Sequence, residues 1–182
     1  MIIIMESVYE YNKKLSSINY GWYDKQGNLY KGLSKSFNFK KNYYMQKVSD
    51  IIKNNHAICW ELCELERTFF HKKYPYITVF AVLKDHKNMP CHTFLIFKNN
   101  QKYYWFESSW DKFKGVHEYQ SISDIFTDIK NNFSSFTKTT NFDSEKISFY
   151  LYHKPLFRCT CNMFYANALI FGKEIKNQKY PI

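Results

Sequence analysis

The 182-residue chain is 45% hydrophobic and 20% aromatic, which excludes an intrinsically disordered protein and allows one domain with a sizeable core. Its formal net charge of +10 comes almost wholly from scattered lysines, with arginine only at Arg67 and Arg158. Because nucleic-acid readers rely on arginine for phosphate and guanine contacts, we interpret the charge as a solvated basic surface and do not expect a nucleic-acid partner.

The cysteines predict a reducing compartment. Their number is odd and their spacing fits no disulfide framework: Cys59, Cys63, Cys91, Cys159 and Cys161. They also lack the paired spacings of a zinc site, so no metal or other cofactor is expected. The N-terminal Met-Ile-Ile-Ile-Met is too short for a signal peptide, and no apolar run approaches a membrane span. We therefore expect a cytoplasmic protein with no membrane partner.

Residues 1–182 are interpreted as one domain that begins with helices. Apolar residues at helical spacing predict a helix over 6–18. Residues 20–30 hold a turn cluster between aromatic flanks, which fits either a loose hairpin or an ordered loop. A second helix is expected from Asn42, which can cap it, with Met45 and Ile51 on its apolar face.

The middle of the chain predicts a third helix and three strands. Leu62, Leu65 and Phe69 recur on one face of a helix over 59–70. Residues 76–83 are apolar and β-branched, which is typical of a buried strand. The segments 91–97 and 102–107 read as the two strands of a hairpin.

The last part of the chain adds two helices and a strand. Ser121 or Ser123 can cap a short helix, and a polar stretch over 131–145 separates it from a strand over 147–152. A terminal helix over 161–171 is expected to end at Gly172. Helices followed by consecutive strands indicate an α+β fold, in which an antiparallel sheet packs against the helix over 59–70.

Cys59 opens the predicted helix over 59–70. Unpaired N–H groups and the positive end of the helix dipole favour an anion there, so the thiol can become a nucleophilic thiolate. The alternative is that Cys59 is a small buried hydrophobic residue, the commoner role of a free cysteine. Cys63 is a rival nucleophile, but it lies one turn further in, gains less from the dipole, and is interpreted as a core residue.

The predicted hairpin places a histidine beside a carboxylate. If Asn99 and Asn100 form a two-residue turn, His92 lies directly opposite Glu107, with both side chains on one face and their Cβ atoms roughly 5 Å apart. The carboxylate would then engage one ring nitrogen and leave the other to take a thiol proton. A register shift of one residue would put the two side chains on opposite faces. Alternatively, His92 bonds the backbone and Glu107 faces solvent.

Taken together, these residues resemble the transglutaminase-like superfamily, which has the papain-like cysteine-enzyme fold. Cys59-Trp60 lies at a helix start, His92 opens a strand, and an acid ends the next strand. Over about residues 42–130 the sequence is similar to small bacterial and phage members, in the segments Cys-Trp-Glu, His-Thr-Phe and Tyr-Trp-Phe-Glu-Ser-Ser-Trp. The resemblance implies a catalytic core over about 42–152, with Cys59 as nucleophile, His92 as base and Glu107 as orienting acid. Glutamate stands where the family has aspartate.

The resemblance also implies acyl transfer on a protein or peptide substrate. Cys59 would attack a carboxamide or peptide carbonyl, and the acyl group would pass to water or to an amine. N–H groups at the helix start would hold the oxyanion, with Trp60 or Trp110 as candidates to assist, unless both indoles only pack in the core. The second hypothesis is an inactive domain of this fold whose basic, aromatic surface binds an acidic protein or a nucleic acid.

Overall fold

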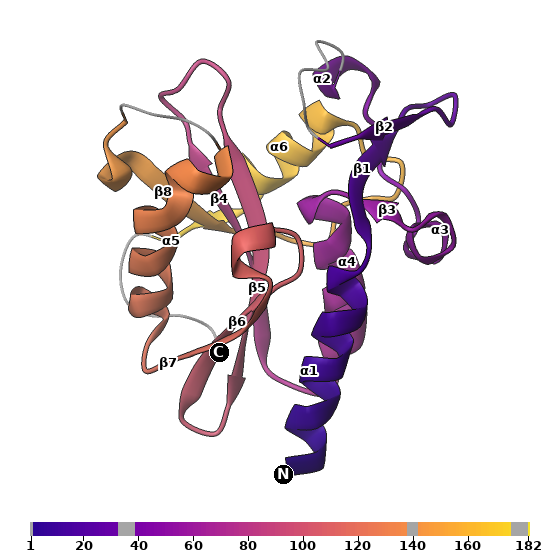
Figure 1. Cartoon of the computed structure of the whole chain (residues 1–182). Helices are drawn as coiled ribbons and strands as arrows, with labels where there is room; N and C mark the ends of the chain where they lie inside the picture. Colours follow the sequence, from indigo (N-terminus) through magenta and orange to yellow (C-terminus); the bar gives the residue numbers. More distant parts are fainter. Residues whose placement is uncertain (1, 33–38, 138–141, 176–181) are drawn as a thin grey trace.

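The computed structural model describes residues 2–32, 39–137, 142–175 and 182, which form a mixed α+β fold (Figure 1). Its main sheet has the strand order β7-β6-β5-β4-β8-β9, and every neighbouring pair in it is antiparallel. In chain order these strands are β4 (Tyr76–Leu83), β5 (Cys91–Asn99), β6 (Lys102–Glu107), β7 (Gly115–Tyr119), β8 (Ile147–Leu151) and β9 (Lys173–Glu174).

A smaller sheet has the order β2-β1-β3, and the helices complete the fold. Its strands are β1 (Asn19–Tyr23), β2 (Leu29–Lys31) and β3 (His56–Ala57). The helices are α1 (Ile2–Ser16), α2 (Phe39–Asn42), α3 (Val48–Asn54), α4 (Cys59–Phe70), α5 (Ile122–Thr137) and α6 (Cys161–Leu169). Two short 3₁₀ turns cover Asp111–Phe113 and Ser144–Lys146.

Helices cover both faces of the main sheet, α5 on one side and α4 with α1 on the other (Figure 1). The alternation of side chains along β5 explains this, because successive residues of a strand point to opposite faces. Phe94 and Ile96 join the core cluster that contains α5, whereas Leu95 and Phe97 join the cluster that contains α1 and α4. A strand that is buried on both faces therefore lies at the centre of the protein.

Several predicted elements are confirmed. The helix over 59–70 matches α4, the strand over 76–83 matches β4, and the predicted antiparallel sheet packs against α4. The turn cluster in 20–30 forms the hairpin of β1 and β2. Ser121 caps α5, since its hydroxyl accepts from the Asp124 N–H at 3.2 Å while the Asp124 carboxylate accepts from the Ser121 N–H at 3.0 Å.

The helix predicted from Asn42 is wrong in its start. Asn42 ends the short α2, and the next helix begins only at Val48. The backbone between them pairs elsewhere: Tyr43 bridges to Asp24, and the Met45 N–H donates to the Cys159 carbonyl at 3.0 Å. These long-range bonds keep the segment extended.

Three other boundaries also differ from the predictions. The first is that of α1, which covers Ile2–Ser16 where a helix over 6–18 was expected. The polar stretch over 131–145 begins as helix, because α5 continues to Thr137 and buries Phe133 one turn beyond Ile129. The terminal helix ends at Leu169, before Gly172, where a Cβ would collide with the Ala168 carbonyl oxygen. Glycine is thus required there by close backbone approach. The strands β3, β7 and β9 were not predicted.

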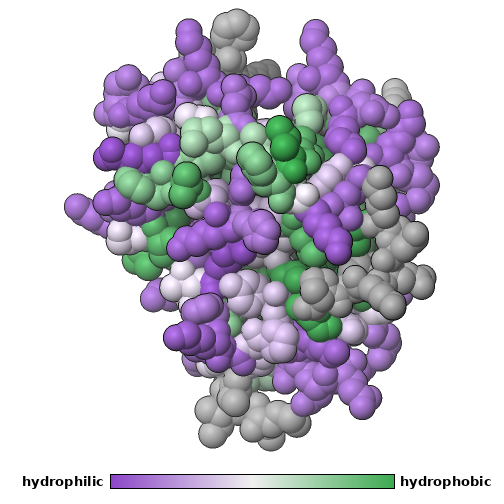
Figure 2. Space-filling model, turned by 180° about the vertical axis from the view of Figure 1, so that it is seen from behind, coloured by the Kyte–Doolittle hydropathy of each residue, from purple (hydrophilic) through white to green (hydrophobic). Residues whose placement is uncertain are grey.

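The surface carries some exposed apolar side chains (Figure 2). The three most exposed of them flank α6: Leu156, Ile170 and Phe171. No helix of the described residues combines the length and the apolar character that crossing a membrane requires.

Candidate active site

Cys59 is the first residue of α4 and is 4% exposed. Ile58 precedes it in an extended conformation, and the Glu61 carboxylate accepts the Ile58 N–H at 3.2 Å and the Gln46 N–H at 2.9 Å. Glu61 itself is fully buried. Burial raises its pKa to about 7, although these hydrogen bonds lower it. The start of the helix is therefore fixed by its own first turn, which positions the thiol.

His92 and Glu107 meet at the end of the β5–β6 hairpin. The imidazole Nε2 lies 2.7 Å from the Glu107 Oε2, and both side chains are buried. The pairing of β5 with β6 runs from Asn99 opposite Lys102 to Leu95 opposite Phe106. Glu107 lies one residue beyond the last pair, and His92 lies three residues beyond it. The predicted contact is confirmed.

The predicted register of this hairpin is wrong by two residues. The turn falls at Asn100 and Gln101, and Asn100 takes the left-handed φ of 56°. Continued, this register would set Glu107 opposite Phe94 and make His92 its diagonal neighbour. Diagonal partners are about 7–8 Å apart at Cα, within reach of a long side chain. A two-residue shift keeps both side chains on one face, and the extra methylene of glutamate provides the reach.

Glu107 is held by backbone donors as well as by His92. Its Oε1 accepts the N–H groups of Ser109 and Trp110, both at 2.8 Å. Burial raises its pKa, but the charge of His92 and these hydrogen bonds outweigh burial, so the net shift is downward. From α1, the Asn12 amide donates to the Glu107 carbonyl oxygen at 2.8 Å. The carboxylate is thus kept ionised and fixed in position.

His92 links this carboxylate to the thiol. Burial lowers its pKa, but the charge of Glu107 and hydrogen bonding to Cys59 and Glu107 raise it to about 10. Burial likewise raises the pKa of Cys59, but hydrogen bonding to His92, its charge and hydrogen bonding to Thr93 lower it below 9. Since Glu107 engages Nε2, Nδ1 is the ring nitrogen that is left for the thiol. The arrangement favours a thiolate beside an imidazolium.

The two indoles named from the sequence lie on either side of this group. Trp60 stacks on Phe164 with ring centroids 4.0 Å apart, and its side chain lies near Cys91. The Trp110 ring meets the His92 ring edge-on at 5.5 Å and packs into the core under α5. Trp110 therefore supports the imidazole from the side of the sheet that α5 covers.

Sequence reasoning missed three contributors to this site. Thr93 follows His92 directly and lies beside the thiol, so its position in the sequence was a usable signal. Asn12 and Tyr20 come from α1 and β1, far from the triad along the chain. Their approach depends on long-range pairing, which no local pattern reveals.

The second turn of α4 buries another acid behind the triad. Glu66 is 2% exposed, and the Ser108 hydroxyl donates to its Oε1 at 2.6 Å. Burial raises its pKa to about 8, the Ser108 hydrogen bond opposes this, and the charge of Glu107 adds to it. Beside it, burial and the charge of Glu66 raise the pKa of Cys63 well above 9. Cys63 therefore remains a thiol, as its interpretation as a core residue predicts.

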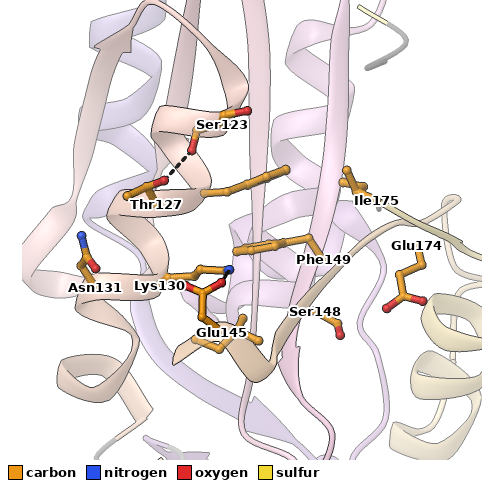
Figure 3. Close-up of a pocket in the computed structure, with 11 residues that line it drawn as sticks. Ser123, Thr127, Lys130, Asn131, Glu145, Ser148, Phe149, Glu174 and Ile175 are labelled. Atoms are coloured by element: carbon orange, nitrogen blue, oxygen red, sulfur yellow. Dashed lines mark hydrogen bonds and ion pairs between the residues drawn. The ribbon is translucent and has the colours of Figure 1, made fainter. Parts of the chain in front are cut away.

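A surface pocket of about 430 Å³ lies elsewhere, bordered by α5, β8 and β9 (Figure 3). Lys130 and Glu145 form an ion pair of 2.6 Å across its lining. Cys59, His92 and Glu107 are not among the residues that line it. No group of three or more His, Cys, Asp or Glu side chains in the described residues is arranged to hold a metal ion.

The site thus consists of a buried thiol, an imidazole and a carboxylate in series, with a buried phenol and a threonine beside the thiol. The chain matches no model of a known protein family, no curated protein and no solved structure.

Proposed function

We propose that the chain is a cysteine-dependent enzyme that transfers the acyl group of a protein or peptide amide. The observation that carries this proposal is the position of His92, which contacts the Glu107 carboxylate at 2.7 Å and lowers the pKa of the Cys59 thiol. A nucleophile next to a base that a third group orients is the arrangement that covalent acyl transfer needs.

In the proposed reaction the Cys59 thiolate attacks the amide carbonyl carbon and forms a C–S bond. The C–N bond then breaks, and the leaving ammonia or amine takes the proton from the His92 imidazolium. In the second half, water or an amine attacks the thioester while His92 takes its proton, and the thiolate leaves. Glu107 stays ionised throughout and stabilises the imidazolium.

The fold class supports a transglutaminase-like, papain-like core as part of this proposal. A helix that starts with the nucleophile packs on an antiparallel sheet, and the histidine and the acid follow on adjacent strands. The proposed core over about 42–152 needs the segment before it as well, because Asn12 and Tyr20 contact the site.

Alkylation with iodoacetamide tests the proposed nucleophile. At pH 7 Cys59 should be labelled faster than any other cysteine, because its pKa is lowered whereas those of Cys63, Cys91, Cys159 and Cys161 are raised. Peptide mass spectrometry locates the label. The Cys59→Ala variant should lose the fast phase, and the matched Cys63→Ala variant should keep it. Uniformly slow labelling of all five cysteines would contradict the proposal and leave the binding-module hypothesis.

A further inference from the structure

Tyr20 is brought to the nucleophile by the small sheet. β1 pairs in parallel with β3, and this register places Tyr20 beside Ala57, two residues before Cys59. The Tyr20 carbonyl accepts the Gly32 N–H at 2.9 Å, which holds the strand from its other edge. The Tyr20 side chain packs against the core cluster that contains Ile58 and Cys59. Its position is therefore fixed by backbone pairing on both sides.

The phenol hydroxyl of Tyr20 is buried, and among the described residues it has no hydrogen bond of ordinary length and angle. Burial raises its pKa well above 10; the charge of Cys59 and hydrogen bonding to its sulfur add to this, and the Cys59 backbone N–H opposes it. The phenol oxygen thus lies beside both the sulfur and the backbone N–H of the same residue. A buried O–H costs free energy unless it finds an acceptor, so this group is poised for one that arrives during the reaction.

We propose that the Tyr20 hydroxyl is a catalytic residue that donates a hydrogen bond to the oxyanion formed when Cys59 attacks a carbonyl. The backbone N–H of Cys59 supplies the second donor. As the C–S bond forms, the π electrons of the carbonyl move onto oxygen, and both donors stabilise that charge without transferring a proton. When the C–N bond breaks, the carbonyl is restored and both donors are released. The inference rests on the proposed acyl transfer.

Other nearby donors are directed elsewhere. The Tyr165 hydroxyl donates to the Met89 carbonyl at 3.0 Å and lies 3.2 Å from the Cys91 sulfur. The Trp60 indole stacks on Phe164 and lies near Cys91, and Trp110 lies against the His92 ring. Tyr165 is therefore a matched control: it is a tyrosine near the same thiol whose hydroxyl is already committed.

The test compares two reactions of the same thiol. p-Nitrophenyl acetate acylates it through an oxyanion and releases p-nitrophenolate in a burst, whereas iodoacetamide alkylates it by displacement and forms no oxyanion. In Tyr20→Phe we expect the burst rate constant to fall by about 10²–10³-fold, the usual loss for one oxyanion donor. The plateau rate of alkylation at high pH should stay near that of the wild type. Tyr165→Phe should leave both rates nearly unchanged.

Each outcome bears on the inference. A burst in Tyr20→Phe as fast as that of the wild type overturns the role of Tyr20 and leaves acyl transfer standing. An equal fall in the rates of acylation and alkylation has the same meaning. No burst from the wild-type protein overturns acyl transfer and the role of Tyr20 together. If Tyr20→Phe does not fold, 3,5-difluorotyrosine at position 20 keeps the hydroxyl and makes it a stronger donor. At a pH below the one at which the difluorotyrosine hydroxyl ionises, acylation faster than in the wild type supports the inference, and an unchanged acylation rate overturns it.

Discussion

The first and second turns of α4 each bury a cysteine, and the two thiols have opposite properties. Cys59 and Cys63 are 4% and 0% exposed, so burial disfavours the thiolate at both. The neighbouring groups supply the difference: His92 and Thr93 of β5 lower the pKa of Cys59, whereas Glu66 of α4 itself raises that of Cys63 further. The groups around each thiol, and not burial, therefore decide which of the two pKa values is lowered.

Replacing His92 should remove most of the difference in thiol pKa between Cys59 and Cys63. In His92→Ala we expect alkylation of Cys59 at pH 7 to slow by about 10²-fold or more, since positioned acid–base groups contribute about 10²–10⁴-fold. Without the imidazolium, burial alone should leave the pKa of Cys59 above its ordinary value of 9, close in behaviour to Cys63. Labelling rates between pH 5 and 10, read by mass spectrometry, check this.

The control for this experiment is His117→Ala. His117 lies on β7 and its Nε2 is 2.6 Å from the Phe113 carbonyl oxygen, so its loss should leave Cys59 labelling unchanged. If His92→Ala labels as fast as the wild type, the imidazole does not activate the thiol.

Removing the charge of Glu107 should reduce the difference in thiol pKa between Cys59 and Cys63 by a smaller amount. In Glu107→Gln the pKa of His92 should fall by roughly 1–3 units, the usual effect of losing an adjacent carboxylate. The imidazolium then persists only to lower pH, so the pH at which Cys59 becomes reactive should rise towards that of an ordinary thiol. An NMR titration of the His92 ring, together with the alkylation profile, measures both shifts.

Glu118→Gln is the matched control for Glu107. Its carboxylate pairs with Lys102 at the surface at 3.0 Å, so its loss should move neither titration. An unshifted His92 titration in Glu107→Gln would mean that the carboxylate does not hold the imidazolium.

The last prediction concerns the free energy of unfolding, which depends on pH through Glu66 in the second turn of α4. The pKa of Glu66 is raised from 4.5 to about 8, so the folded chain retains a proton that the unfolded chain releases between these pH values. This contribution is present below pH 4.5 and is lost as pH rises to about 8, by at most about 1.4 kcal/mol per pH unit. Glu66→Gln should flatten the fall in the free energy of unfolding by urea from pH 5 to 8. Glu145→Gln, an exposed acid, should not. Equal slopes in Glu66→Gln and wild type would show that Glu66 is not protonated in the fold.

The sequence was sufficient to bring His92 and Glu107 together, because placing both on one face of the hairpin depends on the parity of the register. The hairpin register was wrong, since Asn100 and Gln101 form the turn in place of Asn99 and Asn100. Polar turn residues at all three positions made either choice reasonable. A register shift of two residues keeps His92 and Glu107 on one face, so the predicted contact did not depend on which two residues form the turn.

The surroundings of the triad could not be predicted in the same way. Asn12 reaches Glu107 across 95 positions of the chain, and Tyr20 reaches Cys59 through a parallel pairing of two residues. Neither contact follows from periodicity, capping or turn chemistry. The extended segment around Tyr43 was missed for the same reason. Tyr43 bridges to Asp24, and the Met45 N–H donates to the Cys159 carbonyl, so long-range contacts set the backbone conformation there.

The two-residue pairing of β1 with β3 has a practical consequence for protein engineering. Tyr20 of β1 lies beside Cys59 although it precedes this cysteine by more than thirty positions. A shortened version that began at Asn42 would keep the cysteine, the histidine and the acid but would lose Tyr20 and Asn12. A mutant library aimed at new chemistry would accordingly gain more from varying this amino-terminal ribbon than from varying the lysines on the surface.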